Sequence, residues 1–233
     1  MTTFAFIVLC LFLLVGYISI YRRKDLFTPS QDRVFFTHLL IIVLFLVVCI
    51  VSALHLVDSI NSGVYDFFHS FWNSRFDTVM IMASFLGSAE NLSVLSCLLL
   101  IVLHFRKERR LFFFTFISLA GAVVSDLTLK SIFHIARPTV ELIPETFWSF
   151  PSGHSTMIVV FLSAVYYAWT RMYPNVGRGK RYIALTFVFL LSLLVGVSRL
   201  YLGAHWLFDV IGGYLLGLFW VSYAYLSPRP KVL

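Results

Sequence analysis

The chain has 233 residues, of which 60% are hydrophobic and 12% are charged. A soluble globular domain carries roughly 25% charged residues, so this composition excludes an ordinary soluble fold and indicates a chain surrounded by lipid. The formal net charge of +7 does not indicate a nucleic-acid partner, because membrane proteins collect Lys and Arg in their cytoplasmic loops.

Long uncharged apolar stretches organise the sequence. Each approaches the roughly 20 residues that a helix needs to cross a bilayer core. The sequence therefore predicts an all-α integral membrane protein with about seven transmembrane helices. In chain order they are Thr3–Tyr21, Val34–Leu56, Thr78–Leu103, Leu111–Ile132, His154–Arg171, Tyr182–Val197 and His205–Leu226. The fifth and sixth are short, which suggests that their ends lie near polar loops.

The first stretch is expected to be an anchor and not a cleaved signal peptide. Met1-Thr2-Thr3 carries no positive side chain, and the charges follow the apolar run instead. Residues 1–33 are therefore predicted to form an N-terminal anchor helix and a cytoplasmic loop. Residues 34–233 are predicted to form one membrane domain, since the loops are too short for a second.

The placement of positive charges predicts the orientation in the membrane. Fourteen of the 18 Lys and Arg residues fall within residues 22–33, 106–110, 171–181 and 229–231. These are alternate loops, so the positive-inside rule makes that side cytoplasmic and places the N-terminus outside. The other four cations lie on the predicted outer side, and a charge kept near the membrane against the trend is a candidate functional residue. They are Arg75, Lys130, Arg137 and Arg199.

Several other polar or aromatic positions have two interpretations. Residues 64–76 alternate aromatic and polar side chains, which predicts an interfacial amphipathic helix, with anchoring favoured over a role in guiding lipid. Glu90 is interpreted as structural and near the headgroups, and His134 as an interfacial residue and not a substrate contact. Trp148 and Phe150 are either belt aromatics or a wall of a lipid entrance, and the sequence leaves both readings open.

Three short motifs lie in the predicted outer loops. In sequence order they are Lys130-x6-Arg137-Pro138, Pro151-Ser152-Gly153-His154 and Ser198-Arg199-x5-His205-x3-Asp209. On the predicted topology all three reach the same side of the membrane. The sequence therefore predicts one cluster of three cations, two histidines and a carboxylate.

The residue types in this cluster suit phosphate chemistry. Lys130, Arg137 and Arg199 can balance the charge of a phosphate, and the two guanidinium groups can each contact two of its oxygens. Ser152 offers a hydroxyl, and Gly153 offers a backbone N–H and close approach where a helix begins, a position that favours anions.

Two pairs of residues stand four positions apart. His205 and Asp209 would share a helix face, so that the carboxylate holds one imidazole nitrogen and leaves the other available as a nucleophile. Asp126 precedes Lys130 by four residues and is expected to pair with it, either to position the lysine or as a purely structural ion pair.

Taken together, the three motifs resemble the signature motifs of the type 2 phosphatidic acid phosphatase (PAP2) superfamily. The resemblance spans Lys130 to Asp209 directly, and it implies a six-helix PAP2-like core to which the first helix is an added anchor. It also implies a membrane lipid phosphatase in which His205 attacks phosphorus to give a phosphohistidine. His154 would protonate the leaving oxygen and then activate water, with no cofactor required.

The resemblance suggests four substrate candidates: undecaprenyl pyrophosphate, phosphatidylglycerophosphate, phosphatidic acid and the lipid A phosphates. It also suggests a bacterial inner membrane, with the site facing the periplasm or exterior. Two histidines and an aspartate could bind zinc, but three neighbouring cations would repel a bare divalent ion, so no metal is expected. A lipid phosphotransferase of the same superfamily and a non-enzymatic anion or lipid transporter remain alternatives.

Overall fold

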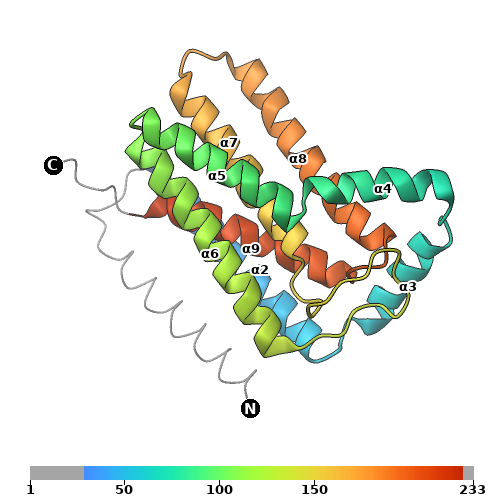
Figure 1. Cartoon of the computed structure of the whole chain (residues 1–233). Coiled ribbons are helices and arrows are strands. Elements are labelled where there is room, and N and C mark those ends of the chain that lie inside the picture. Colours follow the sequence, from blue (N-terminus) through green and yellow to red (C-terminus); the bar gives the residue numbers. More distant parts are fainter. Residues whose placement is uncertain (1–28, 228–233) are drawn as a thin grey trace.

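The regular structure is entirely helical in residues 29–227, which are the residues that the computed structural model describes (Figure 1). The helices are α2 (Pro29–Ala53), α3 (Asp58–His69), α4 (Ser74–Leu86), α5 (Ala89–Phe105), α6 (Arg109–Phe133), α7 (Gly153–Met172), α8 (Arg178–Tyr201) and α9 (Leu207–Leu226). The predicted all-α class is confirmed. The predicted anchor at Thr3–Tyr21 lies outside the described residues.

Within that range, five helical stretches are long and apolar enough to cross a membrane. They are Arg33–Ala53, Arg75–Phe105, Arg109–Phe133, Arg178–Tyr201 and Leu207–Leu226. Many large apolar side chains on them are exposed, among them Phe36, Val94 and Ile183, as expected for surfaces that face lipid. The chain is therefore a multi-pass membrane protein.

Helix α7 is a further member of the bundle and is surrounded by other helices. It packs against α6, α8 and α9, and its first turns carry Ser and Thr in place of larger apolar residues. Two glycines of α9 permit this packing, because a Cβ on Gly213 would lie 2.5 Å from Ser152 O and one on Gly217 would lie 2.8 Å from Thr156 O. The beginnings of α7 and α9 are thereby brought together.

The third predicted span, Thr78–Leu103, is not one continuous helix. It is divided into α4 and α5 at Gly87, and the Ser88 side chain caps α5 by accepting a hydrogen bond from Asn91 N at 3.2 Å. A Cβ on Gly87 would lie 2.5 Å from Val195 Cγ1 and 3.5 Å from His154 Cβ. The break therefore lets this segment lie against the start of α7. Glu90 falls in the first turn of α5, where it is exposed.

Two other boundary predictions were wrong. The sixth span is not short, because the polar residues at both ends of Tyr182–Val197 continue the helix and α8 has 24 residues. Residues 64–76 do not form one amphipathic helix. Helix α3 ends at His69, and α4 begins after Asn73, whose side chain accepts hydrogen bonds from Arg75 N and Phe76 N.

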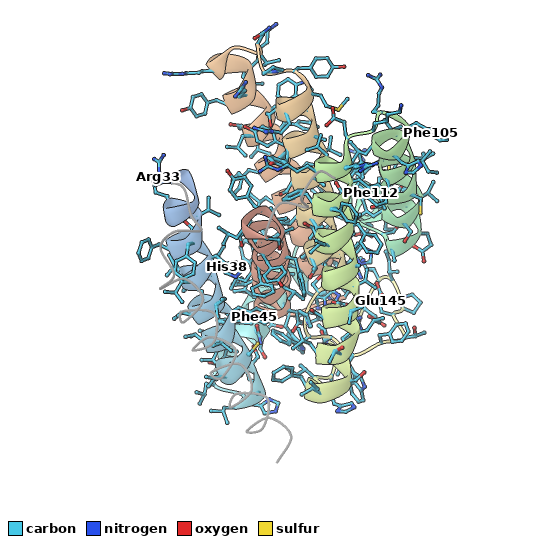
Figure 2. The ribbon with its side chains drawn as sticks, turned by 90° about the vertical axis from the view of Figure 1, so that its left-hand side faces the viewer. Arg33, His38, Phe45, Phe105, Phe112 and Glu145 are labelled. Atoms are coloured by element: carbon cyan, nitrogen blue, oxygen red, sulfur yellow. The ribbon has the colours of Figure 1, made fainter. Side chains whose placement is uncertain are left out.

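The two ends of the bundle differ in chemistry. The basic α5–α6 and α7–α8 connections lie at one end, while the three motifs and residues 134–152 lie at the other. In Figure 2, Arg33 and Phe105 lie toward the first end and Glu145 toward the second. The predicted separation of basic loops from motif loops is therefore present in the fold.

Candidate active site

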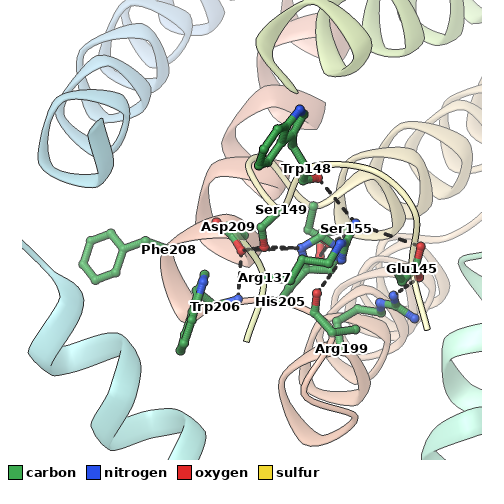
Figure 3. Close-up of polar contacts among 12 residues, drawn as sticks. Arg137, Glu145, Trp148, Ser149, Ser155, Arg199, His205, Trp206, Phe208 and Asp209 are labelled. Carbon is green, nitrogen blue, oxygen red and sulfur yellow. Dashed lines mark hydrogen bonds and ion pairs between the residues drawn. The ribbon is translucent and has the colours of Figure 1, made fainter. Parts of the chain in front are cut away.

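The three motifs converge where four helices of the bundle end or begin. Lys130 lies in the last turn of α6, His154 in the first turn of α7, Arg199 in the last turn of α8 and Asp209 in the first turn of α9. Residues 134–152 cross this end of the bundle and add polar contacts from above (Figure 3). The predicted cluster is thus assembled from distant parts of the chain.

His205 is buried in the short connection between α8 and α9, with its two ring nitrogens facing different partners. Nδ1 lies 3.5 Å from Asp209 Oδ2, and Nε2 lies 3.1 Å from Arg137 Nη1. A guanidinium group can only donate, so Nε2 must accept and the ring proton must reside on Nδ1. The surroundings therefore fix the tautomer and aim the Nε2 lone pair toward a cation.

His205 has electrostatic surroundings that oppose protonation. Burial lowers the pKa of its imidazole well below the usual value, and the charges of Arg137, Arg199 and Lys130 lower that pKa further. The ring is consequently neutral at neutral pH. A neutral ring is the form in which Nε2 is nucleophilic.

Asp209 does not lie on the same helix as His205, since α9 begins at Leu207. Its Oδ2 accepts hydrogen bonds from Trp206 N at 2.8 Å and from Ser149 Oγ, which also lies 3.4 Å from His205 Nδ1. Ser149 is fully buried. It was not predicted, because a serine in an aperiodic loop carries no signal beyond its position two residues before Pro-Ser-Gly-His.

The Arg137 side chain is largely buried and donates hydrogen bonds both within the connection between α6 and α7 and to the connection between α8 and α9. Its Nε donates to Phe147 O at 2.7 Å, its Nη2 to Trp148 O at 3.4 Å and its Nη1 to Ala204 O. Burial lowers the pKa of the guanidinium, and the nearest carboxylate, Glu145, opposes that change. The predicted clamp on phosphate would therefore use N–H groups that also hold His205 in place.

Arg199 is 1% exposed and is held by two side chains. Its Nη1 donates to Ser84 Oγ at 2.5 Å, and its Nη2 pairs with Glu145 Oε1. Within the described residues, its Nε is buried without a hydrogen-bond partner. Glu145 was not predicted as a site residue, because it lies in the long connection between α6 and α7 with no motif around it.

The expected pair of Asp126 and Lys130 is present, with Nζ 2.6 Å from Oδ2. Gly153 lies directly against this pair, since a Cβ at that position would stand 3.3 Å from Asp126 Oδ2 and 3.4 Å from Lys130 Nζ. The absence of a side chain at Gly153 therefore lets the start of α7 approach the lysine.

Ser152 and His154 occupy the start of α7. Ser152 Oγ accepts hydrogen bonds from Ser155 N and Ser155 Oγ, and Ser152 N donates to Asp209 O at 3.0 Å. Its hydroxyl therefore caps the helix. His154 is half-buried, close enough to Arg199 and Lys130 for their charges to act on its ring.

Three neighbouring aromatic residues are also placed. His134 directly follows the last residue of α6 and has a left-handed backbone conformation, with φ 47°. Its ring makes a T-shaped contact with Trp148, with ring centroids 4.9 Å apart. Trp148 is exposed, whereas Phe150 is fully buried in a core cluster with Val48 and Cys49. Phe150 is therefore a core residue. It is neither a belt aromatic nor a wall of a lipid entrance, the two interpretations that the sequence left open.

A cavity of about 240 Å³ reaches the cluster from the side of the α2–α3 corner. Its lining includes Ser52, His55, Asn61, Arg137, Trp206 and Asp209. No group of three or more His, Cys, Asp or Glu residues that could hold a metal ion occurs within residues 29–227.

The fold and the cluster define a multi-pass membrane protein whose helix ends enclose a site with three cations, their carboxylate partners and two histidines. The family model of the PAP2 superfamily matches residues 109–232, more than half of the chain. The chain therefore belongs to the PAP2 superfamily.

Curated relatives and a solved structure resemble this chain. Phosphatidylglycerophosphatase B of Bacillus subtilis is 35% identical over 91 residues, 39% of this chain and 44% of that protein. An undecaprenyl-diphosphatase of Sulfolobus acidocaldarius is 29% identical over 135 residues, 53% of this chain and 57% of that protein. The chain thus spans about half the length of these relatives.

A crystal structure of a transmembrane PAP2-type phosphatidylglycerolphosphate phosphatase from Bacillus subtilis superposes with a TM-score of 0.74 at 23% identity. The match covers 81% of this chain and 94% of that one. At this identity the likeness concerns the fold.

Proposed function

We propose that this protein is a membrane lipid phosphatase that hydrolyses a lipid phosphomonoester or pyrophosphate. The observation that carries the proposal is the orientation of His205, whose Nε2 lone pair faces Arg137 while its Nδ1–H faces Asp209. A neutral, oriented nucleophile beside Lys130, Arg137 and Arg199 suits attack on a phosphorus atom whose oxygens the cations hold.

In the proposed reaction, His205 Nε2 forms a bond to phosphorus as the bond from phosphorus to the lipid oxygen breaks. His154 donates a proton to that oxygen, and the lipid product leaves. His154 then accepts a proton from a water molecule that attacks the phosphohistidine, which releases inorganic phosphate and restores Nε2. Asp209 stabilises the positive charge that develops on the ring, through Nδ1–H.

The setting of the site supports a lipid substrate on the outer face of the membrane. The cluster lies at the ends of membrane-spanning helices, at the end of the bundle opposite the basic loops. Helix α3 at this end exposes Phe67, and the relatives named above carry the names of lipid phosphatases. We infer that residues 34–233 form the catalytic unit, in a bacterial inner membrane with the site facing the exterior.

A panel of lipid phosphates tests the proposal. Purified full-length protein should release inorganic phosphate from at least one of undecaprenyl pyrophosphate, phosphatidylglycerophosphate, phosphatidic acid or lipid A phosphates, measured by phosphate assay. Orthovanadate should inhibit, and EDTA should leave the rate within about twofold, since no step of the mechanism uses a metal. Label transferred from radiolabelled substrate to a second lipid would indicate a phosphotransferase, and loss of activity in EDTA with rescue by zinc would contradict this mechanism.

The pH dependence of kcat/KM provides a second prediction. Neutral His205 is lost as pH falls through its pKa, and burial lowers the pKa of this imidazole below 6.5. The acid limb that belongs to His205 is therefore expected below pH 6.5. A phosphate monoester also titrates near pH 6, so a second substrate with a more acidic phosphate serves as the control. A limb centred above pH 6.5 with both substrates would contradict the assignment.

A further inference from the structure

The cluster is electrically balanced by its own side chains. Lys130 pairs with Asp126, Arg199 pairs with Glu145, and Arg137 lies close enough to Asp209 for the two charges to interact. These three carboxylates offset the three cations, and the negative charge of Glu141 also acts on Arg137 and Arg199. A phosphate dianion that entered this site without any rearrangement would bring two uncompensated negative charges into a largely buried region.

Glu145 differs from the other two carboxylates in its freedom to move. Asp126 and Asp209 are fixed on helices, and their side chains are 13% and 2% exposed. Glu145 lies on the connection between α6 and α7, and its side chain is 24% exposed. It is therefore the carboxylate that can leave the cluster with the least disturbance of the fold.

The contact of Glu145 with Arg199 occupies part of a surface suited to an oxyanion. Of the Arg199 nitrogens, Nη1 is engaged by Ser84, Nη2 is engaged by Glu145, and Nε is buried without a partner in the described residues. The N–H groups of Nε and Nη2 form one edge of the guanidinium, which can hold two oxygens of a single phosphate side by side. Glu145 fills half of that edge and leaves the other half unsatisfied.

Three hydrogen bonds hold the connection between α6 and α7 where Glu145 faces Arg199. The backbone N of Glu145 donates to Glu141 Oε1 at 3.2 Å, and Leu142 N donates to Leu202 O at 2.9 Å. Tyr65 on α3 anchors the same connection by donating to Val140 O at 2.9 Å. Figure 3 shows the Glu145 carboxylate between the guanidinium groups of Arg137 and Arg199.

We propose that the Glu145 carboxylate competes with the substrate phosphate for Arg199. Phosphate displaces the carboxylate from Nη2 and takes the whole Nε–Nη2 edge, and the carboxylate returns when inorganic phosphate leaves. This inference rests on the proposed function, because it requires that phosphate binds beside Arg199. Its consequence is that Glu145 weakens the hold on phosphate and so favours release of the product.

Binding of inorganic phosphate tests the inference without turnover. Titration calorimetry on the purified full-length protein in detergent should show that Glu145→Gln binds phosphate about 10-fold more tightly than the unsubstituted protein. Glu141→Gln is the matched control, since Glu141 is on the same connection and acts on Arg199 through its charge without a hydrogen bond to it, and since glutamine keeps an oxygen that can accept from Glu145 N. It should change the affinity by less than about threefold. The thermal unfolding midpoints of both variants establish that they are folded.

The other possible results of the phosphate titration contradict the inference. Unchanged or weaker phosphate binding in Glu145→Gln would overturn the inference, and weaker binding would mean that Glu145 holds Arg199 in position. An equal gain in Glu145→Gln and Glu141→Gln would overturn it as well, because the effect would then be one of general charge. If neither the unsubstituted protein nor Glu145→Gln bound phosphate at millimolar concentration, or if Arg199→Gln bound it as well as the unsubstituted protein, the proposed function would fail along with the inference.

Discussion

Replacing His205 by Asn is expected to reduce phosphate release by on the order of 10⁴-fold or more. The lone pair on Nε2 is held toward Arg137 by a tautomer that Asp209 and Arg137 define from opposite sides of the ring. An asparagine amide has no comparable nucleophile, although it fits the space. Phosphate release from the preferred lipid, measured as kcat and kcat/KM, provides the quantitative comparison.

Trapping of the intermediate separates a lost nucleophile from a damaged fold. Unsubstituted protein quenched during turnover of radiolabelled lipid should retain label that is stable to base and labile to acid, as a phosphohistidine is, and His205→Asn should retain none. His104→Asn is the matched control, since His104 is exposed near the opposite end of the bundle in the last turn of α5. It should keep both activity and label. Label persisting in His205→Asn would assign the nucleophile elsewhere.

The helices could be predicted from the sequence because their signal is long and local. Apolar runs of about 20 residues mark membrane-spanning helices whatever the tertiary contacts. The break at Gly87 could not be predicted in this way, since it lies inside a predicted apolar span and depends on the approach of Val195 and His154. The full extent of α8 was missed because its end turns are polar.

The cluster itself could be predicted because motif residues stand at helix ends. Lys130, His154, Arg199 and Asp209 each fall within a turn of such an end, and the alternation of basic loops brings those ends to one side. Ser149 and Glu145 could not be predicted, because residues 134–152 have no periodicity and their contacts are set by the elements around them. The backbone partners of Arg137 could not be predicted either. Every residue has a backbone carbonyl group, so the sequence does not indicate which one accepts a hydrogen bond from the guanidinium.

Replacing Asp209 by Asn is expected to lower kcat by about 10²- to 10³-fold and to change KM little. Two donors, Trp206 N–H and Ser149 O–H, point at the position of Oδ2. They should hold the oxygen of the new amide there, so that His205 Nδ1–H still faces an acceptor and the tautomer is retained. What is removed is the negative charge that stabilises the ring as its bond to phosphorus forms. The loss should therefore be smaller than that of His205→Asn.

Substitution of Ser149 tests whether the two donors orient the amide of Asp209→Asn, because the Ser149 hydroxyl is one of them. Ser149→Ala alone should reduce kcat by about 10-fold, since Asp209 keeps its charge and the hydrogen bond from Trp206. Combining Ser149→Ala with Asp209→Asn should reduce kcat by more than the product of the two separate losses, because the amide can then turn its NH₂ toward Nδ1 and force the ring proton onto Nε2. If the two losses simply multiply, the orientation of the amide does not govern the tautomer, and the contribution of Asp209 is one of charge alone.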